Sequence, residues 1–387
     1  MTSRQVKLLV GLLIVFRVVV LLGMIIGLPH GTSYNRFDAD AARYHHIASA
    51  AETPYRDFQV EVPPIALGAI ELIDGATPRA TAIRLGWTML VLDLFVAAVL
   101  WVTWGWRATV GYLVLGLPLA FIIYFRLDLI SIALAALATA LVHRGRERSG
   151  GVILAASIFA KFWPIALLPL LLVQRRWRAL RWSVAGLALG TATWMWWGGW
   201  SGPAQVLTFR HAHGWHVQSL VGNLVDIVSG PTLLEQGTLR VGSAPLWALS
   251  LLLAGLMICS SVIWLHCSRR PQFVNGLGAL SAVAALLVFS PLLSDQYVFW
   301  LFPWAAIASA EGDRDVVLTC FLVGVATAAL GLVLASEGLA PPLTLLRNVL
   351  LVVVMVDAIR RLRRKAAGEF EEVMTLHLPE PSLRVRS

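Results

Sequence analysis

The chain has 387 residues, of which 58% are hydrophobic and 14% are charged, and its formal net charge is +9 at pH 7. Soluble domains are roughly half apolar and about a quarter charged, so this composition excludes an ordinary soluble protein and indicates one embedded in a membrane. The basic residues gather at the ends of apolar segments, which is typical of membrane topology and argues against a nucleic-acid partner.

Apolar runs of about membrane length predict about ten transmembrane helices. We expect these spans at 6–28, 82–104, 108–125, 128–142, 181–200, 243–266, 274–293, 296–310, 315–335 and 341–358.

Residues 150–173 form a further apolar run with arginines on both sides. Because a single crossing cannot begin and end on the same side, we expect a re-entrant hairpin of two short helices with its tip at 161–164, where proline breaks the helix. The predicted fold class is therefore an all-α polytopic membrane protein in the plasma membrane, with both termini cytoplasmic. We expect a membrane domain over 1–365 and a disordered cytoplasmic tail over 366–387.

The external loop after the first span is rich in acidic residues. We expect two short interfacial helices in it, at 39–51 and 63–74, because Asp38 can cap the first and a proline opens the second. Asp40 would lie in the first turn of the first helix, with Tyr44 one turn further along the same face.

These two aspartates allow two interpretations. They can cap and charge the start of the helix, or Asp40 can accept a proton from a substrate hydroxyl as a general base. Asp38 is the alternative base.

Lys161 is the one lysine in the middle of an apolar segment. An ionisable group at such a place is a functional hypothesis, and the alternatives are that the lysine reaches the interface or pairs with Asp128. Phosphate recognition uses arginine and lysine. The cations expected on the external side are Lys161, Arg126, Arg210, Arg43 and Arg56.

Other polar residues remain open to two interpretations. His211, His213 and His216 can bind a metal or contact a sugar. Gln296 and Tyr297, at the outer end of a span, can bind substrate or anchor the interface. Arg17 and Asp93 both lie inside apolar spans and can pair as a structural contact.

Several short motifs resemble the GT-C glycosyltransferase superfamily, and the closest likeness is to bacterial mannosyltransferases that use polyprenyl-phosphate mannose. The first loop holds D-x-x-x-Y at 40–44, PYRDF at 54–58 and E-x-P-P at 61–64. KFWP at 161–164, HGWHVQSLVGNL at 213–224 and SDQYVFWLFPW at 294–304 follow in the order of that family. The chain departs from the family pattern at Val62, Gln218 and Asp295, which bears on the sugar and the acceptor more than on the class.

The resemblance implies an inverting glycosyltransferase that moves mannose from a polyprenyl-phosphate donor to an acceptor hydroxyl on the external face. The acceptor would be a glycolipid or a cell-envelope glycan, and membrane lipids would surround the enzyme. Asp40 would be the base, and the substrate-binding residues would be Tyr44, Tyr55, Glu61, Asp128, His213, His216, Gln296 and Tyr297. We expect no cofactor, with a divalent metal as the alternative. The alternative function is a secondary transporter or lipid flippase, which would require broken helices in two matching halves.

Overall fold

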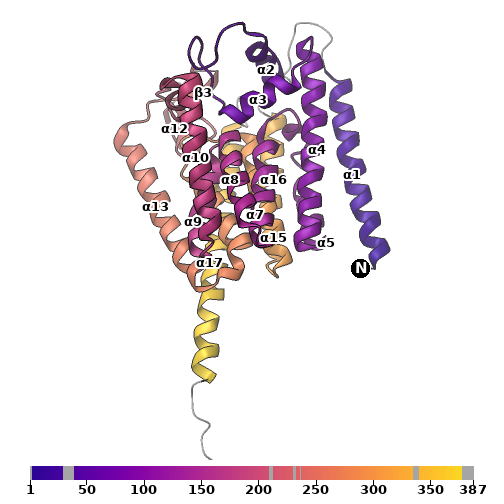
Figure 1. Cartoon of the computed structure of the whole chain (residues 1–387), viewed down its shortest axis with the longest axis vertical. Coiled ribbons are helices and arrows are strands. Elements are labelled where there is room, and N and C mark those ends of the chain that lie inside the picture. The colour runs from indigo at the N-terminus through magenta and orange to yellow at the C-terminus, as the bar shows by residue number, and fades with distance from the viewer. Residues whose placement is uncertain are drawn as a thin grey trace, which may run out of the picture.

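The computed structural model describes residues 2–28, 39–208, 212–229, 232–235, 237–333 and 340–376. These residues form a helical bundle whose long helices run roughly along the longest axis of the molecule (Figure 1). The short helices α2 (Ala39–Ser49) and α3 (Pro64–Ile73) lie at one end of the bundle. The N-terminus and the far end of α17 (Ala340–Leu376) lie at the opposite end.

Six helical stretches of the described chain are long and apolar enough to cross a membrane. They are α1 (Ser3–Ile26), α4 (Pro78–Trp104), α13 (Leu246–Arg269), the stretch Pro271–Val288, most of α16 (Asp315–Val333) and the first part of α17. This number supports the predicted polytopic membrane protein. The total of about ten spans stays a prediction, because α7 (Asp128–His143) and α8 (Glu147–Ala160) have only 16 and 14 residues.

The remaining helices of the bundle include η3, η4 and α14, which together form the stretch Pro271–Val288. In chain order, the remaining helices are α5 (Trp106–Leu115), α6 (Ala120–Ile123), η1 (Trp163–Leu167), α9 (Leu168–Val173), α10 (Trp177–Gly198), α11 (Ser201–Leu207), α12 (Leu220–Ser229), η3 (Pro271–Phe273), η4 (Val274–Gly278), α14 (Ala279–Val288), η5 (Asp295–Leu301) and α15 (Phe302–Ala310).

The two predicted short helices are confirmed as α2 and α3, and their position in the interface stays a prediction. Pro63 is the N-cap of α3 and Pro64 is its first residue, as expected for proline at a helix start. The predicted cap Asp38 lies outside the described residues.

Helix α8 packs between α7 and α10 through two adjacent glycines. A Cβ atom on Gly150 would overlap Val142 of α7, and one on Gly151 would overlap the backbone oxygen of Ala179 in α10. Small residues allow helices to approach this closely in a membrane. Lys161, the C-cap of α8, is therefore carried by a tightly packed helix.

The helix breaks where the sequence predicts the tip of a hairpin. Lys161 is extended, with φ −164° and ψ 138°, and η1 begins two residues later with Pro164 near its start. The break is confirmed, and the re-entrant path of its two arms stays a prediction.

A small antiparallel sheet that the sequence analysis did not predict lies in the segment between α11 and α13. Its strands are β1 (Trp215–His216), β2 (Leu233–Glu235) and β3 (Thr238–Val241), in the order β1–β3–β2. Leu234 lies opposite Leu239 in the β2–β3 hairpin. The fold is thus helical with one short sheet.

The expected pair of Arg17 and Asp93 is confirmed in the bundle interior. Arg17 Nε lies 2.7 Å from Asp93 Oδ2, and both side chains are 1% exposed. Tyr112 and Tyr124 donate hydrogen bonds of 2.6 and 2.8 Å to the same carboxylate. A buried charge needs such partners, so this network fixes α1 against α4.

In the structure α17 continues as a helix to Leu376, and the disorder predicted for the tail over 366–387 stays a prediction. Residues 366–376 are rich in alanine, glutamate and other good helix formers, which extend a helix already nucleated by its packed part. Residues 377–387 lie outside the described chain.

Candidate active site

A cavity of about 370 Å³ lies below α2 and α3, where the break after α8 meets η5. Eight of the predicted functional residues line it; seven of them carry charged or phenolic groups and one carries an amide. The predicted residues in its lining are Asp40, Arg43, Tyr44, Glu61, Asp128, Lys161, Gln296 and Tyr297. These residues are distant in sequence, and the fold brings them to one site.

One wall carries alternating charges. Asp40 forms an ion pair with Arg126, and its other oxygen lies 3.6 Å from Arg43 Nη2. Arg43 also pairs with Glu61 at 2.5 Å. Two guanidinium groups next to one carboxylate favour its ionised form, which is the form that can accept a proton. Arg126 thus contacts Asp40 from outside the cavity lining.

The lining carries a second ion pair. Lys161 Nζ lies 2.8 Å from Asp128 Oδ1, and Trp300 Nε1 donates to the same oxygen at 2.7 Å. The alternative that Lys161 pairs with Asp128 is therefore confirmed. Lys161 still lines the cavity, its side chain is 26% exposed, and its Nζ lies 4.4 Å from the centroid of the Tyr297 ring.

Aromatic and aliphatic side chains form the remainder of the cavity. The rings of Tyr297 and Trp300 stack with centroids 4.2 Å apart, and Trp163 stacks on the other side of Trp300 at 5.3 Å. Ile165 and Leu207 line the cavity and are 51% and 61% exposed. Such a surface suits the face of a sugar ring or a hydrocarbon chain.

Besides Arg126, four predicted residues that the structure describes are not in the lining of this cavity. Tyr55 is 1% exposed and donates a 2.6 Å hydrogen bond to the Val62 carbonyl, so it supports the segment that carries Glu61. Burial holds the pKa of Tyr55 above its usual value, so its hydroxyl stays protonated and can donate this hydrogen bond. Arg56 donates to the Trp196 carbonyl.

The two described histidines of the segment between α11 and α12, His213 and His216, also lie elsewhere. The His213 side chain is 87% exposed and lies 3.4 Å from Glu235. His216 is buried in β1, where burial and two nearby arginines lower its pKa to about 3. Arg210 and His211 lie outside the described residues. Among the described side chains, no three His, Cys, Asp or Glu residues gather in a way that could hold a metal.

Sequence reasoning missed Arg347, a fully buried residue of α17. Its guanidinium contacts the Gln218 side chain at 3.2 Å and Asp295 at 3.5 Å, and it donates to the Gln218 carbonyl. This network connects Gln218, just before α12, to Asp295, the first residue of η5. The residue after Asp295 is Gln296, which lines the cavity. An arginine within an apolar span was the available signal.

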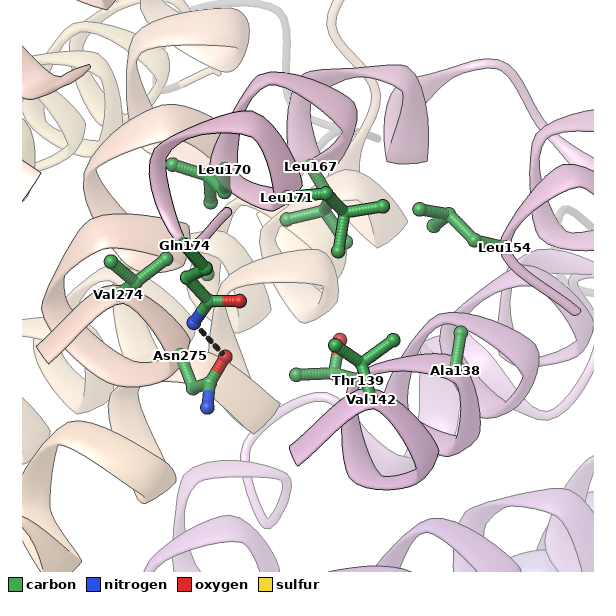
Figure 2. A pocket seen from close by; sticks show the side chains of 11 residues that line it. Ala138, Thr139, Val142, Leu154, Leu167, Leu170, Leu171, Gln174, Val274 and Asn275 are labelled. Carbon is green, nitrogen blue, oxygen red and sulfur yellow. Dashed lines mark hydrogen bonds between the residues drawn. The ribbon is translucent and has the colours of Figure 1, made fainter. Parts of the chain in front are cut away.

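A second, much smaller pocket lies between α7, α9 and η4 (Figure 2). Its volume is about 30 Å³, and aliphatic side chains form most of its walls. Gln174 and Asn275 close one side through a 3.0 Å hydrogen bond. A space of this size can hold about one water molecule but not a sugar ring.

Comparison with known proteins identifies the family of the chain. The family model of glycosyltransferase family 87 matches residues 63–294, which is more than half of the chain. The match includes Arg126, Asp128 and Lys161 and begins after Asp40. No curated protein matches the chain. A membrane-embedded helical bundle with this match is a glycosyltransferase of the GT-C type, and the chain belongs to glycosyltransferase family 87.

Proposed function

We propose that the protein is an inverting transferase that moves mannose from a polyprenyl-phosphate donor to an acceptor hydroxyl on the external face of the plasma membrane. The acceptor is a glycolipid or a cell-envelope glycan. The observation that carries the proposal is that Asp40 and Lys161 line one cavity, whose volume of about 370 Å³ is large enough for a sugar. Family membership favours a transferase over the transporter or flippase alternative.

Asp40 acts as the general base in this mechanism. It accepts the proton of the acceptor hydroxyl, and the oxygen attacks the anomeric carbon of the donor sugar. A bond forms between this oxygen and the anomeric carbon, while the bond from that carbon to the phosphate oxygen breaks. The electron pair leaves with the lipid phosphate, and attack opposite to the leaving group inverts the anomeric centre.

The leaving phosphate requires compensating positive charge, and the lining of the cavity offers two cations. Lys161 is an ammonium group with three donors, of which Asp128 accepts one. Arg43 is the second cation of the lining. Such fixed charges stabilise a developing anion because they need no reorganisation during the reaction. Arg126 then serves mainly to orient and ionise Asp40.

The stacked rings of Tyr297 and Trp300 supply an apolar platform beside the charged groups. A sugar can place its C–H face on such a platform and its hydroxyls toward Glu61 and Gln296. The exposed aliphatic residues Ile165 and Leu207 suit the first isoprene units of the donor.

The test is transfer from labelled polyprenyl-phosphate mannose in membranes that contain the full-length protein. We expect Asp40→Asn to lower the rate by about 10²–10⁴-fold, which is the usual contribution of a general base. Asp57→Asn is the matched control, since Asp57 is an exposed residue of the same loop and asparagine keeps its capping oxygen. Undiminished transfer by Asp40→Asn would remove Asp40 from the mechanism.

A further inference from the structure

We infer that α12 and the β2–β3 hairpin lie in the membrane interface at the active-site end of the bundle, with their apolar faces in contact with lipid. The inference rests on exposure and amphipathic pattern and is independent of the sugar chemistry proposed above.

Helix α12 turns its apolar face outward. Leu224, Ile227 and Val228 are 49%, 48% and 85% exposed, and the spacing i, i+3, i+4 places them on one face. The side packed against the protein holds Leu220, which contacts the core, and the buried Gly222 and Asn223. Gly222 lies against the His216 carbonyl, and Asn223 donates a 3.1 Å hydrogen bond to the Pro341 carbonyl. A surface helix in water has the opposite arrangement, with its apolar face against the core.

The hairpin follows the same rule. Leu233, Leu234 and Leu239 are 71%, 76% and 48% exposed, and Leu234 lies directly opposite Leu239 across the strands. The charged residues of the hairpin are turned toward the protein instead. Glu235 accepts a 3.0 Å hydrogen bond from the Gly214 N–H, and Arg240 donates one of 2.7 Å to the Gly214 carbonyl. Both elements thus present apolar side chains to the outside.

The outward faces continue into the lipid-facing surface of a membrane-spanning helix. Helix α13 begins shortly after β3, and its first residues, Leu246 and Trp247, are 82% and 69% exposed. Trp196 and Trp200, at the end of α10, are 80% and 82% exposed. Tryptophan favours the boundary between lipid and water, and α12 and β3 lie near the start of α13 and the end of α10 (Figure 1).

Lipid is therefore the occupant that these observations favour. A large exposed apolar patch in water would drive association. The apolar faces of α12 and the hairpin instead extend the apolar surface that α13 presents to the acyl chains. The platform formed by α12 and the hairpin is tied to the cavity through Gln218, Arg347 and Asp295. Lipid contact on the platform then fixes the height of η5 relative to the membrane surface.

The test uses spin labels on the full-length protein in lipid nanodiscs that each hold one copy. The three native cysteines, Cys259, Cys267 and Cys320, are first replaced by alanine. Labels are then placed by Leu224→Cys and Leu234→Cys, with Ile227→Cys as a second position on α12. The accessibility of each label to oxygen, which enters lipid, is compared with its accessibility to a water-soluble nickel chelate.

Two control labels set the scale. Leu251→Cys lies on the exposed face of the spanning helix α13, and Asp57→Cys lies on an exposed loop. We expect the α12 and hairpin labels to show the high oxygen-to-nickel ratio of the Leu251 label. A ratio equal to that of the Asp57 label would mean that the platform lies in water. Protection from both reagents would mean that protein covers it. Either result would overturn the inference, and neither depends on the transferase activity.

Discussion

The ion pair between Lys161 and Asp128 provides a sharp test of the site, because its two members differ in burial. The side chain of Asp128 is 2% exposed and that of Lys161 is 26% exposed. Lys161→Met removes the cation, keeps most of the aliphatic stem, and leaves a buried carboxylate with Trp300 as a donor. Breaking a buried pair costs about 3–5 kcal/mol, and the remaining hydrogen bond favours a value of about 3 kcal/mol.

The reverse substitution should cost less. Asp128→Asn leaves an ammonium that is partly exposed and lies 4.4 Å from the centroid of the Tyr297 ring. A cation over an aromatic ring retains about 1 kcal/mol, and partial exposure to the cavity supplies water, so we expect a loss of about 1 kcal/mol.

The free energy of unfolding of each variant is measured in mixed micelles with a denaturant, using tryptophan fluorescence. Lys7→Met is the matched control, because Lys7 is exposed on α1 and its loss should change the stability by less than about 0.5 kcal/mol. The reasoning is refuted if Asp128→Asn costs as much as Lys161→Met, or if Lys161→Met behaves like Lys7→Met.

Three further predictions use the same unfolding measurement. Arg347→Met should lower the free energy of unfolding by about 3 kcal/mol, because it leaves buried polar groups without a hydrogen-bond partner. Arg360→Met, on the exposed side of the same helix, should have little effect. Similar losses in the two variants would refute this prediction. The pKa of His216 is lowered from 6.5 to about 3 by burial and nearby arginines, so its contribution to stability is present above pH 6.5 and is lost as the pH falls toward 3. His216→Asn should therefore flatten the loss of stability between pH 7.5 and 5, and an unchanged slope would contradict it. Burial and the neighbouring Asp313 raise the pKa of Glu311 from 4.5 to about 8, so its contribution is present below pH 4.5 and is lost as the pH rises through 8. Glu311→Gln should make the stability less sensitive to a change from pH 6 to 8.5, and wild-type sensitivity in the variant would count against this account.

Local signals predicted the parts of the site that depend on neighbouring residues. The bounds of α2 and α3 agree with prediction to within about two residues, because prolines and an acidic start mark their ends. The break after α8 was predicted for the same reason, since Pro164 cannot continue a helix.

Contacts between distant segments were harder to predict. The strands β1 and β3 have two and four residues, too few to show an alternating pattern, and they form only because their partners meet in space. The partner of Asp40 was also missed. Arg126 was expected to bind phosphate, which stays a prediction, and its position before α7 also places it against the Asp40 carboxylate.

Charged residues inside apolar spans were the most informative long-range signal. Arg17 and Asp93 were paired from this reasoning alone, and Lys161 with Asp128 was one of its stated alternatives. Arg347 carried the same signal and was overlooked. An ionisable residue at such depth needs a partner, which limits the possible arrangements of the helices.

The contact between Arg17 and Asp93 also has a consequence for how the protein is made. The two residues are 76 positions apart, so α1 is synthesised well before its partner helix α4. An unpaired arginine at the centre of a span opposes insertion by about 2.5–3.5 kcal/mol. The other residues of α1 are apolar enough to offset this cost, so pairing with Asp93 relieves the arginine once the later segment inserts.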